Sequence, residues 1–419
     1  MTSSQSVLAA FAVILLDLAA RAGLDKILAL HGSPAVVAMW AQLQSVVDLV
    51  SGVALAGIAP GLTVLVAQAR GGEEEGGLLR AALRLGPAIA LAAALLFLFA
   101  VPWLQPWLMH GEWGMGLLTL AALTGCIAVL PGLMAAYWLG RHRQQRVLQF
   151  ALLGSLPWGA VAWTVYSGGA LPKLAAAQCL TLLLVALPMG WYMHKLAGHT
   201  AGEAALRKLA HFIPVGLAIG ILSPASMLFI RGILASALSW DDAGLMQALW
   251  RSTEWVTSVA AGVLSLVFLP RLSATSGTLQ FATELRRAAM AVLPLAALLL
   301  LLIFFQQRAV LAALYDARFV VGDKVAALFM LGCLLRIASW VFLYGLYAAR
   351  CTWFIIGGEV LSLPLFASLL WWYADSLSLE RVAMLYCISY VAYLAFTAAG
   401  LIYSRPWRDG MRQEAVSGR

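Results

Sequence analysis

Four arginines lie inside stretches of the sequence that are otherwise apolar: Arg21, Arg231, Arg251 and Arg336. A guanidinium group is a planar fork of N–H donors that fits the oxygens of phosphates and carboxylates. An ionised side chain in the middle of a bilayer costs about 2.5–3.5 kcal/mol on insertion scales, so it needs a partner or a wet cavity. If these arginines face one cleft, the cleft is cationic, and it indicates a substrate that carries phosphate or carboxylate groups.

Acidic residues accompany the arginines: Asp17, Asp25, Asp48 and Glu254. Asp17 and Asp25 lie one turn before and after Arg21, so the three share one helix face. Two interpretations remain open for the acids. They are structural partners, as in Asp17–Arg21 and Arg251–Glu254 pairs, or they hold a coupling cation or proton.

Catalytic chemistry has no visible site in the sequence. The five cysteines show no metal or redox spacing, and the chain has no phosphate-binding loop, zinc-protease motif or serine nucleophile motif. We therefore expect no enzyme activity, no catalytic residues, no resident cofactor and no metal site.

The composition indicates a membrane protein. Hydrophobic residues make up 63% of the chain and charged residues 11%, whereas soluble domains are about one quarter charged. A spanning helix needs about 20 apolar residues. Twelve such stretches predict an all-α polytopic membrane protein with 12 transmembrane helices: 6–30, 35–69, 78–101, 114–139, 147–167, 171–194, 208–238, 242–270, 285–305, 322–348, 352–374 and 380–403.

The basic residues predict the orientation of these spans. Of the 27 Lys and Arg residues, we count seventeen at span ends on the N-terminal side of the membrane, six on the opposite side and four inside spans. By the positive-inside rule, both termini face the cytoplasm. The net charge of +8 then reflects topology and anionic lipid rather than nucleic acid.

A weak internal repeat divides the chain. The stretch RAALRLGP at 80–87 recurs as RAAMAVLP at 287–294, and at the same offset Ser155-Leu156-Pro157 falls on Ser362-Leu363-Pro364. Arg143 also falls on Arg350. We expect two pseudo-symmetric six-helix lobes, with helices 1–6 in residues 1–200 and helices 7–12 in residues 201–419. Parallel repeats around a central cleft are typical of alternating-access transporters.

Two segments carry a family resemblance. AGLMQALWRSTEWVTSVAAGVLSLVFLPRLS (243–273) and WAQLQSVVDLVSGVALAGIAPGLTVLVAQAR (40–70) resemble helices 8 and 2 of the Wzx-type O-antigen and enterobacterial-common-antigen flippases. These flippases belong to the multidrug/oligosaccharidyl-lipid/polysaccharide exporter superfamily. The likeness extends over the whole chain in expected topology and over these two segments in sequence.

The resemblance implies a function in polysaccharide or lipopolysaccharide biosynthesis at the bacterial inner membrane. The protein would move an undecaprenyl-diphosphate-linked oligosaccharide from the cytoplasmic to the periplasmic leaflet. Arg21, Arg231, Arg251 and Arg336 would then bind its pyrophosphate and sugar, and Na⁺, H⁺ or the membrane potential would drive the cycle. Expected partners are membrane lipid, a polysaccharide polymerase and a chain-length regulator.

Three other classes stay open from the sequence. A multidrug exporter of the same superfamily would use the acids of helices 1 and 2, although an arginine-rich cleft repels cationic drugs. A major-facilitator transporter also has twelve spans, but the loop ARGGEEEGGLLR fits its usual basic loop poorly. A polymerase or scaffold subunit would be expected to carry a large periplasmic loop. The glycan, the coupling ion and the oligomeric state do not follow from the sequence.

Overall fold

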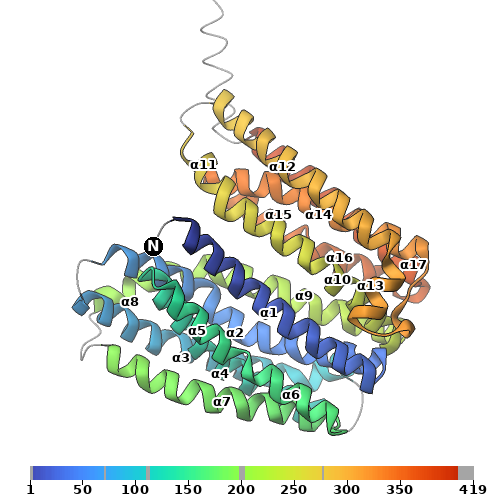
Figure 1. Ribbon diagram of the computed structural model, residues 1–419, viewed down its shortest axis with the longest axis horizontal. Helices are drawn as coiled ribbons and strands as arrows, with labels where there is room; N and C mark the ends of the chain where they lie inside the picture. Colours follow the sequence, from blue (N-terminus) through green and yellow to red (C-terminus); the bar gives the residue numbers. More distant parts are fainter. Residues whose placement is uncertain (1–2, 70–71, 110–113, 198–202, 276–277, 404–419) are drawn as a thin grey trace, which may run out of the picture. The chain divides into compact units, whose positions relative to one another are not determined.

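The computed structural model describes residues 3–69, 72–109, 114–197, 203–275 and 278–403. These residues form helices joined by short connections (Figure 1). By their internal contacts they group into an N-terminal unit, Met1–Ser236, and a C-terminal unit, Ala237–Arg419. Each unit is described in turn.

The N-terminal unit is centred on two long helices, α2 and α4, which pack against each other more extensively than any other pair in the unit. α1 packs against the broken helix pair α5 and α6, and α7 packs against α4 and α6. The helices of this unit are α1 (Ser3–His31), α2 (Pro34–Gln68), α3 (Gly72–Leu108), α4 (Gly114–Gly140), α5 (Gln144–Gly154), α6 (Leu156–Tyr166), α7 (Leu171–Leu196), α8 (Glu203–Ala210) and α9 (Ile213–Ala237).

Glycines of α4 explain its close contact with α2. A Cβ added at Gly125 would lie 2.9 Å from the Val47 carbonyl oxygen, and one added at Gly140 would lie 2.7 Å from the Thr63 carbonyl oxygen. The Thr63 hydroxyl donates a hydrogen bond of 3.0 Å across the interface to the Ala136 carbonyl. Small residues and hydroxyl bonds are the usual means by which membrane helices associate, because lipid provides no hydrophobic force between them.

α2 also runs antiparallel to α9 at very short range. A Cβ on Gly216 would lie 2.1 Å from the Gly57 nitrogen, and a Cβ on Gly220 would lie 2.6 Å from the Gly52 oxygen. These two backbones touch, so no side chain fits between the helices at these positions. The two Gly pairs therefore set the distance between α2 and α9.

The C-terminal unit is built around α14 and α17, its most extensive helix pair. Gly332 of α14 leaves room for Tyr386 of α17, because a Cβ there would lie 2.4 Å from the ring. The Cys387 thiol donates to the Leu328 carbonyl at 2.8 Å. The elements of this unit are α10 (Trp240–Val263), η1 (Leu264–Phe268), α11 (Leu269–Ser273), α12 (Thr278–Phe305), α13 (Gln307–Leu314), η2 (Ala317–Phe319), α14 (Asp323–Ala348), α15 (Thr352–Val360), α16 (Leu363–Trp372), η3 (Ala374–Ser376) and α17 (Leu379–Tyr403).

A π-helical turn, η1, joins α10 to α11 within one continuous helical rod. Pro270 follows it directly and has no N–H to donate to the helix ladder. The Leu269 N–H bonds to the Leu264 carbonyl, five residues back, so the turn is wider than an α-turn. The sequence predicted one uninterrupted span here, and Pro270 accounts for the local change.

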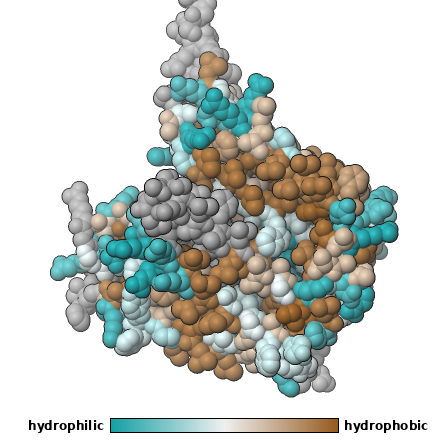
Figure 2. All heavy atoms as spheres, viewed as in Figure 1, coloured by the Kyte–Doolittle hydropathy of each residue, from teal (hydrophilic) through white to brown (hydrophobic). Residues whose placement is uncertain are grey.

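The predicted spans agree closely with the observed helices. Among the described residues, eleven helical segments are long and apolar enough to cross a membrane. The stretch predicted as the first span forms α1 but is not among the eleven, so the count of twelve stays a prediction. Apolar side chains cover the outside of α12, as the brown surface in Figure 2 shows. They include Leu295, Leu298, Leu301, Leu302 and Phe305.

Two local features repeat between the units. The helix predicted at 147–167 is broken between α5 and α6, and the one predicted at 352–374 is broken between α15 and α16. Both breaks fall at the repeated Ser-Leu-Pro triplet. The hydroxyls of Ser155 and Ser362 each donate to a carbonyl three residues back, that of Leu152 (2.7 Å) and that of Glu359 (2.8 Å). The proline then starts the next helix, where it needs no donor.

The turn before each broken helix also repeats. His142 and Arg350 adopt left-handed φ values of 55° and 57°. After each, the next N–H bonds five residues back, at 3.0 Å in both turns, which is the Schellman arrangement that ends a helix. Geometrically, Arg350 therefore corresponds to His142, and the predicted pairing of Arg143 with Arg350 is off by one residue. Between this turn and the Ser-Leu-Pro break, the N-terminal half has one residue more than the C-terminal half.

The expected division at residues 200/201 stays a prediction. The contact grouping divides the chain after Ser236, because α9, the expected first helix of the second lobe, packs on α2. Contacts between helices do not show which helices are related by the repeat.

Candidate substrate and coupling residues

Arg231 is the most deeply buried of the four predicted arginines. It lies on α9 with 5% of its surface exposed, and its Nη1 donates a hydrogen bond of 2.6 Å to the Ser45 hydroxyl of α2. Ser45 is equally buried. A guanidinium has five N–H donors, and through one of them this contact ties α9 to α2.

Amide side chains extend this polar region along α2. The Gln42 amide donates to the carbonyls of Leu108 (3.2 Å) and Leu228 (3.0 Å), so it ties α2 to α3 and α9. Gln44 and Gln178 exchange two amide hydrogen bonds of 3.0 and 2.9 Å. Gln44 and Gln178 are isolated amides inside apolar spans, which is a signal that can be read from the sequence.

Arg21 lies on α1 with its guanidinium over the Trp158 ring of α6, 5.5 Å from the centroid. Stacking on an indole face is a favourable position for a guanidinium outside water. Asp25, one turn further along α1, is buried with 5% exposed. Asp48 of α2 is exposed, and the side chain of Asp17 lies outside the described residues. The contacts described for Arg21 and Arg231 thus involve different helices, and the expectation that both face one cleft stays a prediction.

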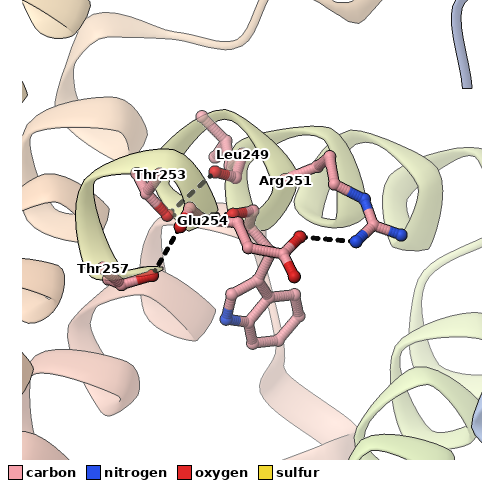
Figure 3. A network of polar contacts seen from close by, with 6 residues as sticks. Leu249, Arg251, Thr253, Glu254 and Thr257 are labelled. Carbon is pink, nitrogen blue, oxygen red and sulfur yellow. Dashed lines mark hydrogen bonds and ion pairs between the residues drawn. The ribbon is translucent and has the colours of Figure 1, made fainter. Parts of the chain in front are cut away.

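Arg251 and Glu254 form an ion pair on α10, with an Nη1–Oε2 distance of 2.5 Å (Figure 3). Their side chains are 14% and 36% exposed. The neighbouring hydroxyls of Thr253 and Thr257 bond to carbonyls of the same helix, those of Leu249 and Glu254. Arg251 and Glu254 therefore pair within one helix, as their i, i+3 spacing allows. This agrees with the interpretation that Glu254 is a structural partner of Arg251. If Arg251 binds substrate, its guanidinium must contact the substrate and Glu254 at the same time.

Arg336 of α14 is surrounded by aromatic rings. Its guanidinium lies 4.8 Å from the centre of the Trp340 ring and 5.9 Å from that of Tyr390. It also interacts electrostatically with Tyr386 and with Glu359 of α15. No acid lies within one turn of Arg336 on its own helix, and Glu359 of α15 interacts with it electrostatically from another helix.

The tyrosines around Arg336 form a continuous row along α17, and sequence reasoning missed them. Tyr386 and Tyr390 are in edge contact at 4.8 Å, and Tyr390 and Tyr393 at 6.0 Å. Trp250 of α10 packs edge-on against Tyr386 at 6.0 Å. All three tyrosines are almost fully buried. The i, i+4 and i+7 spacing of these tyrosines on one helix face can be read from the sequence. Their proximity to Arg336 of α14 cannot.

The fold is shared with solved structures of membrane transporters. The chain resembles an inward-facing multidrug resistance MATE family transporter of the MOP superfamily, with a TM-score of 0.77, 13% identity, and coverage of 97% of this chain and 96% of that one. It also resembles the lipid II flippase MurJ in its inward closed conformation, with a TM-score of 0.70, 13% identity, and coverage of 95% and 87%. The all-helical architecture is thus that of MOP transporters. No protein-family model matches the chain.

At the level of sequence, the chain is similar to the lipid III flippases of Escherichia coli (strain K12) and Shigella flexneri. Each is 23% identical over 387 residues, which cover 88% of this chain and 91% of the relative. The homologues are flippases and transporters, not enzymes. The chain is accordingly a multi-pass membrane protein that is similar in sequence to lipid III flippases. This agrees with the resemblance read from helices 2 and 8 at the level of the superfamily and does not single out the O-antigen branch.

Proposed function

We propose that the protein is a flippase that moves an undecaprenyl-diphosphate-linked oligosaccharide from the cytoplasmic to the periplasmic leaflet of the bacterial inner membrane. The observation that carries the proposal is the similarity to lipid III flippases along 88% of the chain. A TM-score of 0.70 to a lipid II flippase agrees with it at the level of fold. The glycan, which the resemblance placed in O-antigen or lipopolysaccharide synthesis, is part of the proposal.

The arginines give the proposal its chemistry. Arg21, Arg231, Arg251 and Arg336 bind the diphosphate and the first sugars, because charge-assisted guanidinium contacts suit clustered phosphate oxygens. Arg231 has the strongest support, since it is buried and its guanidinium reaches the Ser45 hydroxyl of a second helix at 2.6 Å. A flippase also requires a polar route for the sugar and a lipid-exposed path for the polyprenyl chain.

The acids provide the coupling in this proposal. Asp17, Asp25 and Asp48 hold a cation or a proton, and Glu254 holds Arg251 in place. Asp25 supports the idea because it is a carboxylate with 5% exposure inside a helix of the N-terminal unit. If Asp17→Asn and Asp25→Asn transport normally between pH 6 and 8 and in low sodium, the acids are structural partners only.

The test is a transport assay with purified protein in proteoliposomes. The probe is a polyprenyl diphosphate carrying a fluorescent sugar, and an impermeant reductant bleaches only the outer leaflet. A flippase makes nearly all of the probe accessible, whereas protein-free liposomes expose only about half. A parallel assay follows ethidium efflux, because the fold is shared with a multidrug transporter. Ethidium efflux without flipping of the lipid-linked sugar would assign the protein to drug export instead.

In the cell, we expect the protein to work with a polysaccharide polymerase and a chain-length regulator, with both termini in the cytoplasm. The reason is that a polymerase would use the lipid-linked unit that the flippase delivers to the periplasmic leaflet. Co-purification of a polymerase with the tagged protein from native membranes would support the partnership, and its absence under cross-linking would count against it.

A further inference from the structure

A groove of about 590 Å³ lies on the N-terminal unit between the broken helix α5–α6 and α7. α6 packs closely along α7, whereas α5 touches it only sparsely, so the two rods diverge from the Ser155 break toward the start of α5 (Figure 1). Pro188 lies within the continuous helix α7 and lines the same groove. The groove therefore follows from the break between α5 and α6.

The walls of the groove are apolar over most of their length. Leu153 and Leu156 contribute from one side, and Leu184, Val185 and Met189 from the other. Leu153, Leu156 and Leu184 are 43%, 51% and 70% exposed, and α5–α6 is among the least buried of the candidate spans. An apolar trough on an outer, exposed face of a membrane helix pair meets lipid rather than water.

One end of the groove is cationic and aromatic. Arg146, in the first turn of α5, lines it together with Phe150 and Tyr192. The Arg146 guanidinium lies 5.6 Å from the centre of the Trp138 ring, which is stacked with Tyr192 at 6.5 Å. Arg141, also over Trp138, pairs with Glu75 at 3.1 Å. Among the residues that the structure describes, Arg146 makes no ion pair, so its charge is available at the mouth of the groove.

We propose that this groove binds an anionic phospholipid, with its phosphate on Arg146 and one acyl chain along the leucine-lined trough. A guanidinium and a tyrosine that line the same end of the groove match one phosphate with a glycerol ester below it. Tyrosine and arginine are the side chains that anchor at the level of lipid headgroups. A cation near the membrane surface attracts anionic lipid by about 1 kcal/mol, which is about fivefold in affinity. This inference goes beyond the proposed flippase activity and does not depend on it.

The test is native mass spectrometry of the full-length protein, delipidated in detergent and titrated with palmitoyl-oleoyl phosphatidylglycerol or with phosphatidylcholine of the same chains. We expect wild type to bind phosphatidylglycerol about fivefold more tightly than phosphatidylcholine. Arg146→Ala should abolish this preference. Arg143→Ala is the matched control, because Arg143 is an exposed arginine of the same connection that does not line the groove. Equal loss in both variants would show diffuse attraction to a basic surface and overturn the proposal.

A second pair of variants tests the trough. Leu184→Trp places an indole in the groove and should weaken both phospholipids, whereas Leu180→Trp, one turn away on the same helix and outside the groove, should leave both unchanged. If a polyprenyl diphosphate displaces phosphatidylglycerol at equal concentration, the occupant is the transported lipid and the commitment to phospholipid is wrong. Binding is measured without transport, so failure of the proposed flippase activity would leave this result standing, and the converse also holds.

Discussion

Arg231 is a buried arginine inside an apolar helix. The Ser45 hydroxyl of α2 accepts a hydrogen bond from its Nη1 at 2.6 Å. Burial of a charge is costly unless it is paired and hydrogen-bonded. An ionisable side chain kept inside a membrane span is therefore a candidate for binding a charged ligand.

Removal of this guanidinium should reduce transport more than it reduces abundance. We expect Arg231→Ala to weaken substrate binding about tenfold or more, because a hydrogen bond to a charged group contributes about 1.5–3 kcal/mol. Arg231→Lys keeps the charge but not the fork, so it should restore transport only in part. Ser45→Ala should have a smaller effect than either. Transport in proteoliposomes at matched protein amounts measures this, and full transport by Arg231→Ala would remove Arg231 from the site.

The pair of Arg251 and Glu254 separates a structural role from a binding role. If Glu254 only neutralises Arg251, then Arg251→Ala and Glu254→Gln should each lower the midpoint of thermal unfolding. The loss of unfolding free energy in the double variant should then be smaller than the sum of the losses in the two single variants. The difference should be roughly 0.5–1 kcal/mol, since Glu254 is partly exposed. If Arg251 also binds substrate, Arg251→Ala alone should weaken transport while Glu254→Gln preserves it. Equal loss of transport in both single variants would favour the purely structural role.

At the scale of helices, glycines decide which elements touch. Gly216 and Gly220 bring α9 onto Gly57 and Gly52 of α2, and Gly125 does the same for α4. None of this was readable from the sequence, because a glycine in a membrane span has many uses and its partner lies far along the chain. The positions of the helices were predictable, since apolar length alone determines them.

Gly216→Ala should therefore separate α2 from α9. The new methyl group would lie 2.1 Å from the Gly57 nitrogen, and overpacking of this kind costs about 1–3 kcal/mol. We expect a lower midpoint of thermal unfolding for the purified protein. Gly159→Ala on α6 is the matched control, because a Cβ there meets nothing within 4 Å and alanine favours a helix. An unchanged midpoint for Gly216→Ala would mean that the α2–α9 contact is dispensable for stability.

The candidate site was only partly predictable for a related reason. The four arginines and their acids stand out because charge is rare in apolar spans, and the Arg251–Glu254 contact follows from i, i+3 spacing. By contrast, Arg336 lies over Tyr390 of α17 and interacts electrostatically with Tyr386 of α17 and Glu359 of α15. These partners come from separate helices, and helix periodicity says nothing about which helices are neighbours.

At the scale of the molecule, the repeat is visible in backbone geometry as well as in sequence. The left-handed turns at His142 and Arg350, and the breaks at Ser155 and Ser362, recur at nearly the same offset. A left-handed residue other than glycine costs about 1–2 kcal/mol, so its recurrence at the same place is informative. It supports descent of the two halves from one unit.

The orientation that follows from the basic residues can be tested by thiol labelling. The turn before α5 is predicted to face the cytoplasm and the turn before α7 the periplasm. Gln145→Cys should therefore resist an impermeant thiol reagent applied outside the inner membrane, and Ala170→Cys should react. Both positions are exposed, whereas a cysteine at Gly169 would strike Thr164 at 2.6 Å. Wild type, with its five cysteines, gives the background signal, and permeabilised cells show that Gln145→Cys can react. Labelling of position 145 alone in intact cells would reverse the topology and would place the Arg146 end of the lipid groove in the outer leaflet.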